Sequence, residues 1–269
     1  MSVRVSRYSC DGKTVLEIYP HPRPGSSRVN VFVDLSPSMD GKRIFIVKSV
    51  LARLSGFVGE NIVLYGFCRD TRRIYPSDES PAGDPGEALV SQRICYATNP
   101  KPLLREIASS PIRSSIVVTD GEFNKPLHRA LAKAEGLRGK TVHFVLVLPG
   151  EETISYYEGL SRSYGITYSV AEGRTALKVF LESLVAHGAL ESAPIGVEVE
   201  GSPYYNARTF PARPVRGFSV DGLLAPWRIV LERSVPTGES VSAVLLVREL
   251  VSSSLGVVEE RLSRIVVPV

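Results

Sequence analysis

Three oxygen-bearing side chains lie at alternate positions directly after an apolar run near residue 30. The run Val31 to Val33 ends at Asp34, and the hydroxyls of Ser36 and Ser38 follow it. This pattern is typical of a buried parallel strand whose carboxyl end leads into a polar loop. One carboxylate and two hydroxyls are hard oxygen ligands, which favour Mg²⁺, or Mn²⁺ or Ca²⁺, over zinc. The segment therefore predicts one side of a cation site.

Two later segments supply further oxygen ligands. A second apolar run, Ser115 to Thr119, ends at an acid and is followed by Gly121, which permits a tight turn. Between the two runs, a threonine lies in a loop ahead of a helix predicted over Pro102–Ala108. Because parallel strands present their carboxyl ends at one edge of a sheet, we expect these groups to converge there. The predicted site comprises Asp34, Ser36, Ser38, Thr98 and Asp120.

On these residues the chain resembles the von Willebrand factor type A domain. The segment Asp34 to Ser38 is similar to the Asp-x-Ser-x-Ser metal-ion-dependent adhesion site of that family. Thr98 falls where the family places its metal-site threonine, and Asp120 where it places the acid of its fourth strand. The resemblance covers residues 27–188. It departs from the family pattern at Ala97, where many members have glycine.

The resemblance implies a metal-dependent protein-interaction module. Three hydroxyls would ligate the cation, and the two acids would neutralise it, partly through water and hydrogen bonds. The remaining position would exchange water for an Asp or Glu carboxylate of a protein partner, and cytosolic members often work in larger complexes, including systems driven by AAA-type ATPases. Five neighbouring side chains are expected to form a partner-binding rim, with plain loop packing as the alternative role: Pro37, Met39, Tyr96, Asn99 and Phe123.

The middle of the chain alternates apolar strands with helical patterns, and this favours an α/β fold with a doubly wound, mostly parallel sheet. Strands are predicted at residues 31–34, 61–67, 73–76, 115–119, 141–148 and 166–170. Helical spacing of apolar residues is found at 44–54, 102–108, 127–137, 153–163 and 176–186. Residues 77–86, which are rich in Ser, Asp, Pro and Gly, are predicted to form a loop.

The two ends of the chain have a different pattern, typical of antiparallel strands. Alternating apolar residues flank a hairpin signal, Asp11-Gly12, near the start. Towards the end, β-type runs at 195–200, 215–220, 227–231, 241–247 and 265–269 are separated by turn signals at 201–203, 221–222 and 236–238. Since a lone hairpin is marginally stable, we predict that residues 1–26 and 189–269 together form a small antiparallel β-sandwich unit, into which an α/β domain of residues 27–188 is inserted.

The sequence disfavours the common catalytic arrangements, so we predict that the chain is not an enzyme. No Gly-x-Ser-x-Gly turn surrounds Ser36, and none of the four histidines is placed as a base for a nucleophile. Metal-assisted phosphoryl transfer would need further carboxylates and a phosphate-binding glycine loop, and neither is present in the sequence.

Two alternatives to the interaction module remain open, and the first of them follows from the charge of the chain. The formal net charge is +4 and the pI is about 9.0, which suits nucleic acid, but the arginines are mixed with acids along the chain. The dense cluster is Arg69, Arg72 and Arg73. The first alternative is a nucleic-acid-associated protein that uses this basic face. The second is a structural scaffold in which the metal site is vestigial.

The sequence also carries expectations about compartment. The first residues lack an apolar signal core, and no segment is long and apolar enough to cross a membrane. The three cysteines, Cys10, Cys68 and Cys95, show no metal-type spacing and are expected to be buried free thiols. We therefore expect a cytoplasmic protein. The excess of arginine over lysine, with scarce Gln, Met and Cys, is a weak thermophile signal.

Overall fold

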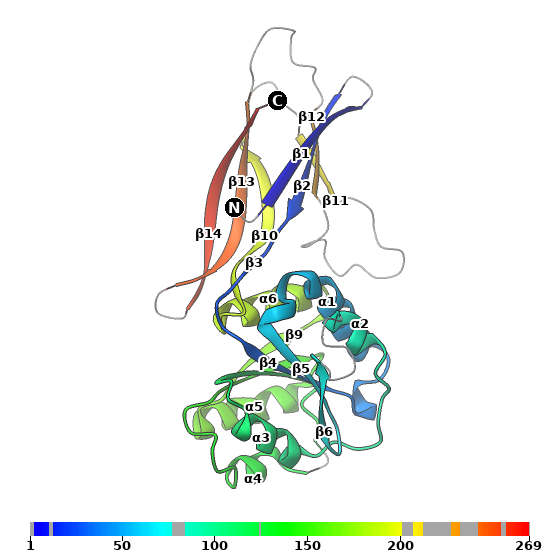
Figure 1. Ribbon diagram of the computed structural model, residues 1–269, viewed down its shortest axis with the longest axis vertical. Coiled ribbons are helices and arrows are strands. Elements are labelled where there is room, and N and C mark those ends of the chain that lie inside the picture. Colours follow the sequence, from blue (N-terminus) through cyan, green and yellow to red (C-terminus); the bar gives the residue numbers. More distant parts are fainter. Residues whose placement is uncertain are drawn as a thin grey trace.

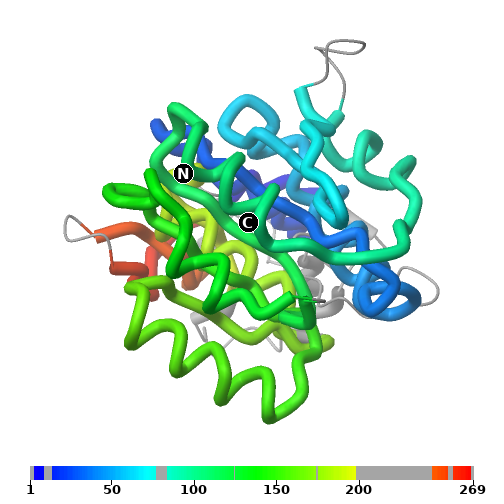
Figure 2. The backbone as a smooth tube through the Cα atoms, turned by 90° about the horizontal axis from the view of Figure 1, so that it is seen from below, coloured from blue at the N-terminus to red at the C-terminus, as the bar shows by residue number. Residues whose placement is uncertain are grey.

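The computed structural model describes residues 3–10, 13–76, 84–123, 125–200, 207–211, 227–231, 242–253 and 257–268. These residues form two parts, an α/β part and a pair of antiparallel sheets, which lie one above the other in Figure 1. Figure 2 shows the α/β part from below, in front of the antiparallel sheets. The predicted fold class, a mostly parallel α/β sheet with a separate antiparallel unit, is confirmed.

The sheet of the α/β part determines where the site lies. Within the described residues it has six strands in the order β6-β5-β4-β7-β8-β9, and every neighbouring pair is parallel except β5 and β6. The chain runs outward from β4 to β5 and β6, then returns to the other side of β4 to form β7, so the carboxyl ends of β4 and β7 lie at the switch point where ligands usually bind. The strands are β4 (Val29–Asp34), β5 (Ile62–Phe67), β6 (Thr71–Tyr75), β7 (Ser114–Thr119), β8 (Thr141–Val147) and β9 (Thr167–Ala171).

Helices cover both faces of this sheet, as the burial of every residue of β4 and β5 requires, because successive side chains point to opposite faces. The valines of β4, such as Val31 and Val33, pack with α1 (Lys42–Val58) and α6 (Ala176–Ala186) on the face toward the antiparallel sheets. Phe32 points the other way, into the core formed with the helices on the far face (Figure 1). Those helices are α3 (Pro100–Ser109), α4 (Leu127–Leu131) and α5 (Glu151–Tyr164). A central strand buried on both faces holds its terminal acid rigidly.

Two helix starts differ from the expectation for local reasons. Helix α3 begins at Pro100, two residues before the predicted start, because Asn99 caps it and proline suits the first turn. The segment predicted as a loop at 77–86 ends in a short helix, α2 (Pro85–Val90). Asp84 caps α2 by accepting hydrogen bonds from the backbone of Gly86 and Glu87. The serine- and proline-rich composition obscured this start.

The antiparallel part joins the two ends of the chain. One sheet has the order β1-β2-β12-β11 and the other β14-β13-β10-β3. Val3, Leu16 and Ile18 of the first sheet face Val197, Leu245 and Val247 of the second in a shared core. The strands are β1 (Val3–Cys10), β2 (Lys13–Pro20), β3 (Arg23–Pro24), β10 (Leu190–Glu200), β11 (Ala207–Pro211), β12 (Trp227–Leu231), β13 (Ser242–Ser252) and β14 (Val258–Pro268).

Some expectations for this part remain untested. The run at 215–220 and the turns at 11–12, 201–203, 221–222 and 236–238 lie outside the described residues. The division of the chain into domains at residues 27 and 188 stays a prediction. None of the described helices is long and apolar enough to cross a membrane.

The chain crosses between the two parts twice, and the crossings lie side by side. The backbone of Gly25 donates to the carbonyl of Ala189 at 2.9 Å, and that of Ser27 donates to the carbonyl of Gly188 at 3.1 Å. The side chain of Asn61 donates to the carbonyls of both Gly25 and Ala189, each at 3.0 Å. A Cβ at position 25 would lie 2.0 Å from the Gly188 oxygen, so only glycine permits this approach.

Candidate metal centre

Asp34 is the centre of a polar network at the carboxyl edge of the sheet. It is the last residue of β4 and has no exposed surface. One carboxylate oxygen accepts a hydrogen bond from the backbone of Ser36 at 2.9 Å, and the other accepts from the Thr119 hydroxyl at 2.7 Å. That hydroxyl in turn accepts from the backbone of Gly121 at 3.0 Å. The acid is therefore held by both neighbouring segments of the sheet edge.

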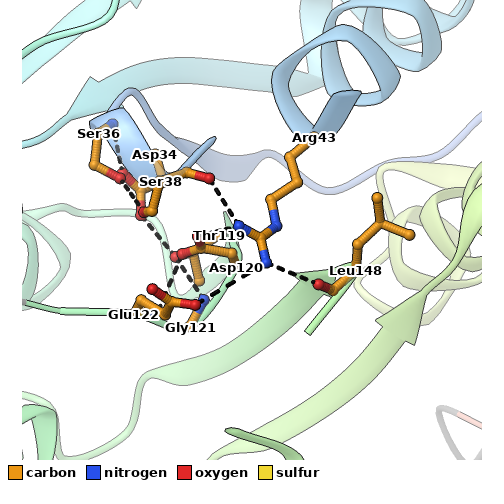
Figure 3. Close-up of polar contacts among 9 residues, drawn as sticks. All are labelled: Asp34, Ser36, Ser38, Arg43, Thr119, Asp120, Gly121, Glu122 and Leu148. Atoms are coloured by element: carbon orange, nitrogen blue, oxygen red, sulfur yellow. Dashed lines mark hydrogen bonds and ion pairs between the residues drawn. The ribbon is translucent and has the colours of Figure 1, made fainter. Parts of the chain in front are cut away.

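The predicted serines lie beside this acid (Figure 3). The hydroxyls of Ser36 and Ser38 are 3.0 Å apart, within one hydrogen bond of each other. Ser36 is buried and Ser38 is half-buried, on the short turn that leads from β4 to α1. A pair of hydroxyls at this spacing beside a buried carboxylate is a compact set of oxygen donors.

Asp120 follows β7 and brings the second carboxylate to the same edge (Figure 3). Its side chain is fully buried. One oxygen, Oδ1, accepts a hydrogen bond from the backbone of Glu122 at 3.1 Å. The other, Oδ2, is buried and has no hydrogen-bond partner among the described residues. This oxygen faces the guanidinium of Arg43 at 3.2 Å, which offsets its charge, and a bound cation is another way to satisfy a buried carboxylate oxygen.

The loop that carries Thr98 is fixed to the same edge. The backbone of Cys95 donates to the carbonyl of Leu35 at 2.8 Å, and that of Asn99 donates to the carbonyl of Cys68 at 2.7 Å. Thr98 itself is buried. The loop therefore lies against the turn that follows β4 and against the end of β5, and the role of Thr98 as a ligand stays a prediction.

A disulfide between Cys68 and Cys95 strengthens this attachment. The expectation of free thiols was wrong for these two residues, because the β5–β6 turn and the Thr98 loop bring them together from positions 27 residues apart. Sequence spacing alone carries no signal for such a contact. The cytoplasmic location stays a prediction.

Arg43 is a site residue that the sequence reasoning missed. It lies in the first turn of α1, and its guanidinium reaches Asp120 Oδ2 at 3.2 Å (Figure 3). It also donates to the carbonyl of Ser38 at 2.8 Å and to that of Leu148 at 3.1 Å. The sequence signal that could have indicated Arg43 is its position five residues after Ser38, at the start of the helix that follows the predicted site.

The backbone of Leu148, which accepts one of these hydrogen bonds, has an unusual conformation. Its φ is 49, in the left-handed region, which costs a residue with a side chain about 1–2 kcal/mol.

Burial and charge shift the ionisation of the site. Burial raises the pKa of the Asp34 carboxyl from its ordinary 3.8 to about 6, while hydrogen bonds from Thr119 and Ser36 oppose this rise. The nearby charge of Asp120 raises it further. A buried acid whose charge is disfavoured by burial, with a second carboxylate nearby, is a suitable environment for a cation.

The donor set decides which cations fit. Among the described residues, no group of three or more His, Cys, Asp or Glu side chains is placed to hold a metal ion, so the candidate site depends on hydroxyls as well as acids. The two carboxylates and two or three hydroxyls are all hard oxygen donors. They fit Mg²⁺, Mn²⁺ or Ca²⁺, with positions left for water.

The predicted rim residues have different surroundings. Tyr96 is 99% exposed and Pro37 is exposed, so both are available at the surface. Asn99 is half-buried and accepts a hydrogen bond from the backbone of Lys101 as the cap of α3. Met39 has no exposed surface and belongs to the core with α1, so its assignment to the rim was wrong. Phe123 is partly buried and stacks on Phe67 with ring centroids 6.2 Å apart.

Comparison with known proteins gives structural likenesses only. No protein-family model and no curated protein matches this chain. A solved von Willebrand factor type A protein from Catenulispora acidiphila is similar at 16% identity and a TM-score of 0.44, over 95% of this chain and 68% of that one. The pilus adhesin SpaC from Lactobacillus rhamnosus GG, in its open conformation, is similar at 13% identity and a TM-score of 0.43, over 97% of this chain and 47% of the adhesin.

The human COPII-coat protein Sec24c is a more distant likeness, with 8% identity and a TM-score of 0.35 over 92% of this chain and 44% of the coat protein. The chain thus spans about half the length of the adhesin and of the coat protein. These likenesses concern the fold. The chemistry of the site rests on the contacts of this chain alone.

Proposed function

We propose that this chain is a von Willebrand factor type A-like interaction module that binds a carboxylate of a protein partner through a divalent cation, Mg²⁺ in the first place. One observation carries the proposal. Two buried acids, Asp34 and Asp120, meet beside the paired hydroxyls of Ser36 and Ser38, and one carboxylate oxygen of Asp120 has no hydrogen-bond partner among the described residues.

The residues of the site have separate tasks in this proposal. The hydroxyls of Ser36, Ser38 and Thr98 are the direct ligands, and the acids offset the charge of the ion. A cation with two charges and two carboxylates are neutral together, so an incoming Asp or Glu of the partner is not repelled by the acids. Tyr96 and Pro37 are exposed, and in this proposal they provide contact surface for the partner.

The first test is calorimetric titration of EDTA-treated protein with Mg²⁺ and with Mn²⁺. We expect saturable binding by the natural chain and its loss, by about a hundredfold or more, in Asp34→Ala. Asp70→Ala, on the exposed β5–β6 turn, is the matched control and is expected to bind as the natural chain does. Equal binding by Asp34→Ala and the natural chain would rule the site out.

The second test concerns the partner carboxylate. A fluorescent peptide with a single central aspartate, and the same peptide with asparagine in its place, are titrated with the protein in Mg²⁺ and in EDTA. We expect a rise in fluorescence polarisation with the aspartate peptide in Mg²⁺ alone. Binding that is the same in EDTA, or with the asparagine peptide, contradicts a metal-held carboxylate. Participation in a complex with an AAA-type ATPase, and the lack of enzymatic activity, stay predictions.

The basic face supports a second candidate function. Exposed Arg72 and Arg93 line a cavity of about 360 Å³ together with the disulfide and the exposed ring of Tyr96. Arginines beside an aromatic ring suit single-stranded nucleic acid. Binding of this kind weakens steeply with salt and is unaffected by EDTA, which distinguishes it from the metal-held carboxylate.

A further inference from the structure

Arg43 lies where its charge opposes the proposed cation. Its Nη1 is 3.2 Å from Asp120 Oδ2, the buried oxygen that has no hydrogen bond. Two backbone carbonyls, of Ser38 and Leu148, accept hydrogen bonds from the same guanidinium and fix its position. The side chain is 27% exposed, so it reaches the site from the surface and is not locked in the core.

The metal-free chain needs such a charge. Asp34 and Asp120 lie buried at one edge, and a pair of buried carboxylates without a cation repel each other. Among the described residues, Arg43 is the cation recorded in an ion pair with either of them. Its guanidinium therefore offsets the charge of Asp120 while no metal is bound.

The bound state creates a conflict. A divalent cation that contacts Asp120 directly or through water needs the same oxygen that faces Arg43, and two cations at this distance repel each other strongly in a buried place. An alternative partner is close. The carboxylate of Glu122 lies 4.0 Å from the other terminal nitrogen, Nη2, and its side chain is 59% exposed (Figure 3). A shift of the guanidinium toward Glu122 would transfer its charge from Asp120 to Glu122, with rearrangement of its hydrogen bonds to the carbonyls of Ser38 and Leu148.

We propose that Arg43 is a built-in counter-cation of the site, which neutralises Asp120 in the metal-free chain and shifts to Glu122 when a divalent cation binds. This inference rests on the proposed function, because it assigns a residue that sets the metal affinity of the same site. The site accordingly binds metal weakly for its ligand set. In the loaded site Arg43 and Glu122 neutralise each other, as do the cation and the two buried acids, so the partner carboxylate meets a formally neutral site.

The test compares Arg43→Gln with Arg43→Lys by two measurements. Calorimetry with Mg²⁺ gives the dissociation constant, and urea unfolding in EDTA gives the stability of the metal-free chain. We expect Arg43→Gln to bind Mg²⁺ at least about tenfold more tightly, because the competing charge is gone, and to unfold at lower urea in EDTA. Arg43→Lys keeps the charge and is expected to stay within about threefold of the natural chain.

Glu122→Gln provides an independent measurement on an exposed residue whose replacement preserves folding. We expect it to weaken Mg²⁺ binding about two- to threefold in the natural background and to have little effect in the Arg43→Gln background, because its role acts through Arg43. Equal weakening in both backgrounds means that Glu122 acts directly on the ion, and this contradicts the shift of Arg43.

The outcomes separate this inference from the proposed function. Mg²⁺ binding by the natural chain that is unchanged or weaker in Arg43→Gln overturns the role of Arg43 and leaves the metal site standing. Binding that is detected only in Arg43→Gln supports the inference strongly. Absence of binding in both chains overturns the inference and the proposed function together, because removal of the competing charge should reveal any site present.

Discussion

The α/β part contains two clusters of polar side chains, and they differ in whether their polar atoms find hydrogen-bond partners within the chain. At the carboxyl edge, Asp34 and Asp120 are buried acids, and one acid oxygen has no hydrogen bond. The second cluster lies beside α6, where the rings of His143 and His187 are 5.5 Å apart next to a cavity of about 420 Å³. His143 has a hydroxyl partner at each nitrogen, Thr167 at 2.8 Å and Ser169 at 3.0 Å.

The two clusters differ in how their charge is balanced. Burial lowers the pKa of His143 from 6.5 to about 4, with a contribution from His187, whose own pKa burial also lowers. The histidine cluster is thus neutral and internally hydrogen-bonded at neutral pH. Among the described residues, Arg43 forms an ion pair with Asp120 of the acid cluster. A polar cluster that satisfies itself is structural, whereas one left incomplete points to a ligand.

Breaking the disulfide should affect the acid cluster alone, and it is the largest effect that we expect. Cys68→Ser, Cys95→Ser and the reduced natural chain should each lose about 3 kcal/mol of unfolding free energy, as the loss of a cross-link of this loop length predicts. Mg²⁺ binding should weaken with it, because the Thr98 loop loses its attachment. Urea unfolding and calorimetry check this, and agreement among the three samples is the control. Unchanged Mg²⁺ binding would separate Thr98 from the site.

A replacement of Gly121 measures how tightly the residues around the acid cluster are packed. It has φ 87, and an added Cβ would lie 2.5 Å from Thr153 and 3.0 Å from the ring of Tyr157. We expect Gly121→Ala to cost about 2–3 kcal/mol, from backbone strain and overpacking together. Gly139 has φ 81 with open space around it, so Gly139→Ala should cost only the strain, about 1 kcal/mol. Urea denaturation measures the unfolding free energy of both variants. Equal losses would mean that Thr153 and Tyr157 move aside to accommodate the added methyl group.

The two clusters should respond to acid with opposite sign. The raised pKa of Asp34 means that its folded form holds a proton more tightly, so its contribution to stability falls as pH rises from about 4 to 6. The lowered pKa of His143 means that its unfolded form takes the proton first, so its contribution falls as pH drops from 6.5 to about 4. Over this shared window the two effects largely cancel in the natural chain.

Single replacements should expose each effect. In EDTA, Asp34→Asn should lose about 2 kcal/mol more than the natural chain between pH 6.5 and pH 4, and His143→Gln should lose about 2 kcal/mol less. Urea unfolding across this pH range measures the slopes, and the double replacement should return close to the natural slope. Identical slopes in the two single variants would show that the clusters do not differ in this way.

The acid cluster was largely predictable from sequence because parallel strands translate a linear pattern into a shared edge. An apolar run that ends in an acid placed Asp34 and Asp120 at the ends of β4 and β7, as found. The position of Arg43 was not predictable in the same way, since it depends on the angle at which α1 leaves the turn and on the left-handed Leu148. The Cys68–Cys95 contact joins two loops, and loop geometry leaves no periodic signal.

The histidine cluster shows the same limit. His143 lies in a strand predicted to be buried, but its hydroxyl partners come from β9 and its neighbour His187 follows α6. Such groups meet only through the packing of three elements that sequence patterns predict one at a time. Met39 failed as a rim residue for a related reason, because the turn after β4 directs it into the core.

The paired crossings beside Asn61 give the molecule a mechanical property. A single linker lets a domain swivel when its ligand is pulled, whereas two neighbouring connections resist torsion. Here the backbone at Gly25 and Ser27 is tied to that at Ala189 and Gly188, and one amide side chain joins both. Tension between the α/β part and the antiparallel sheets is therefore divided between two covalent strands that are joined by these hydrogen bonds.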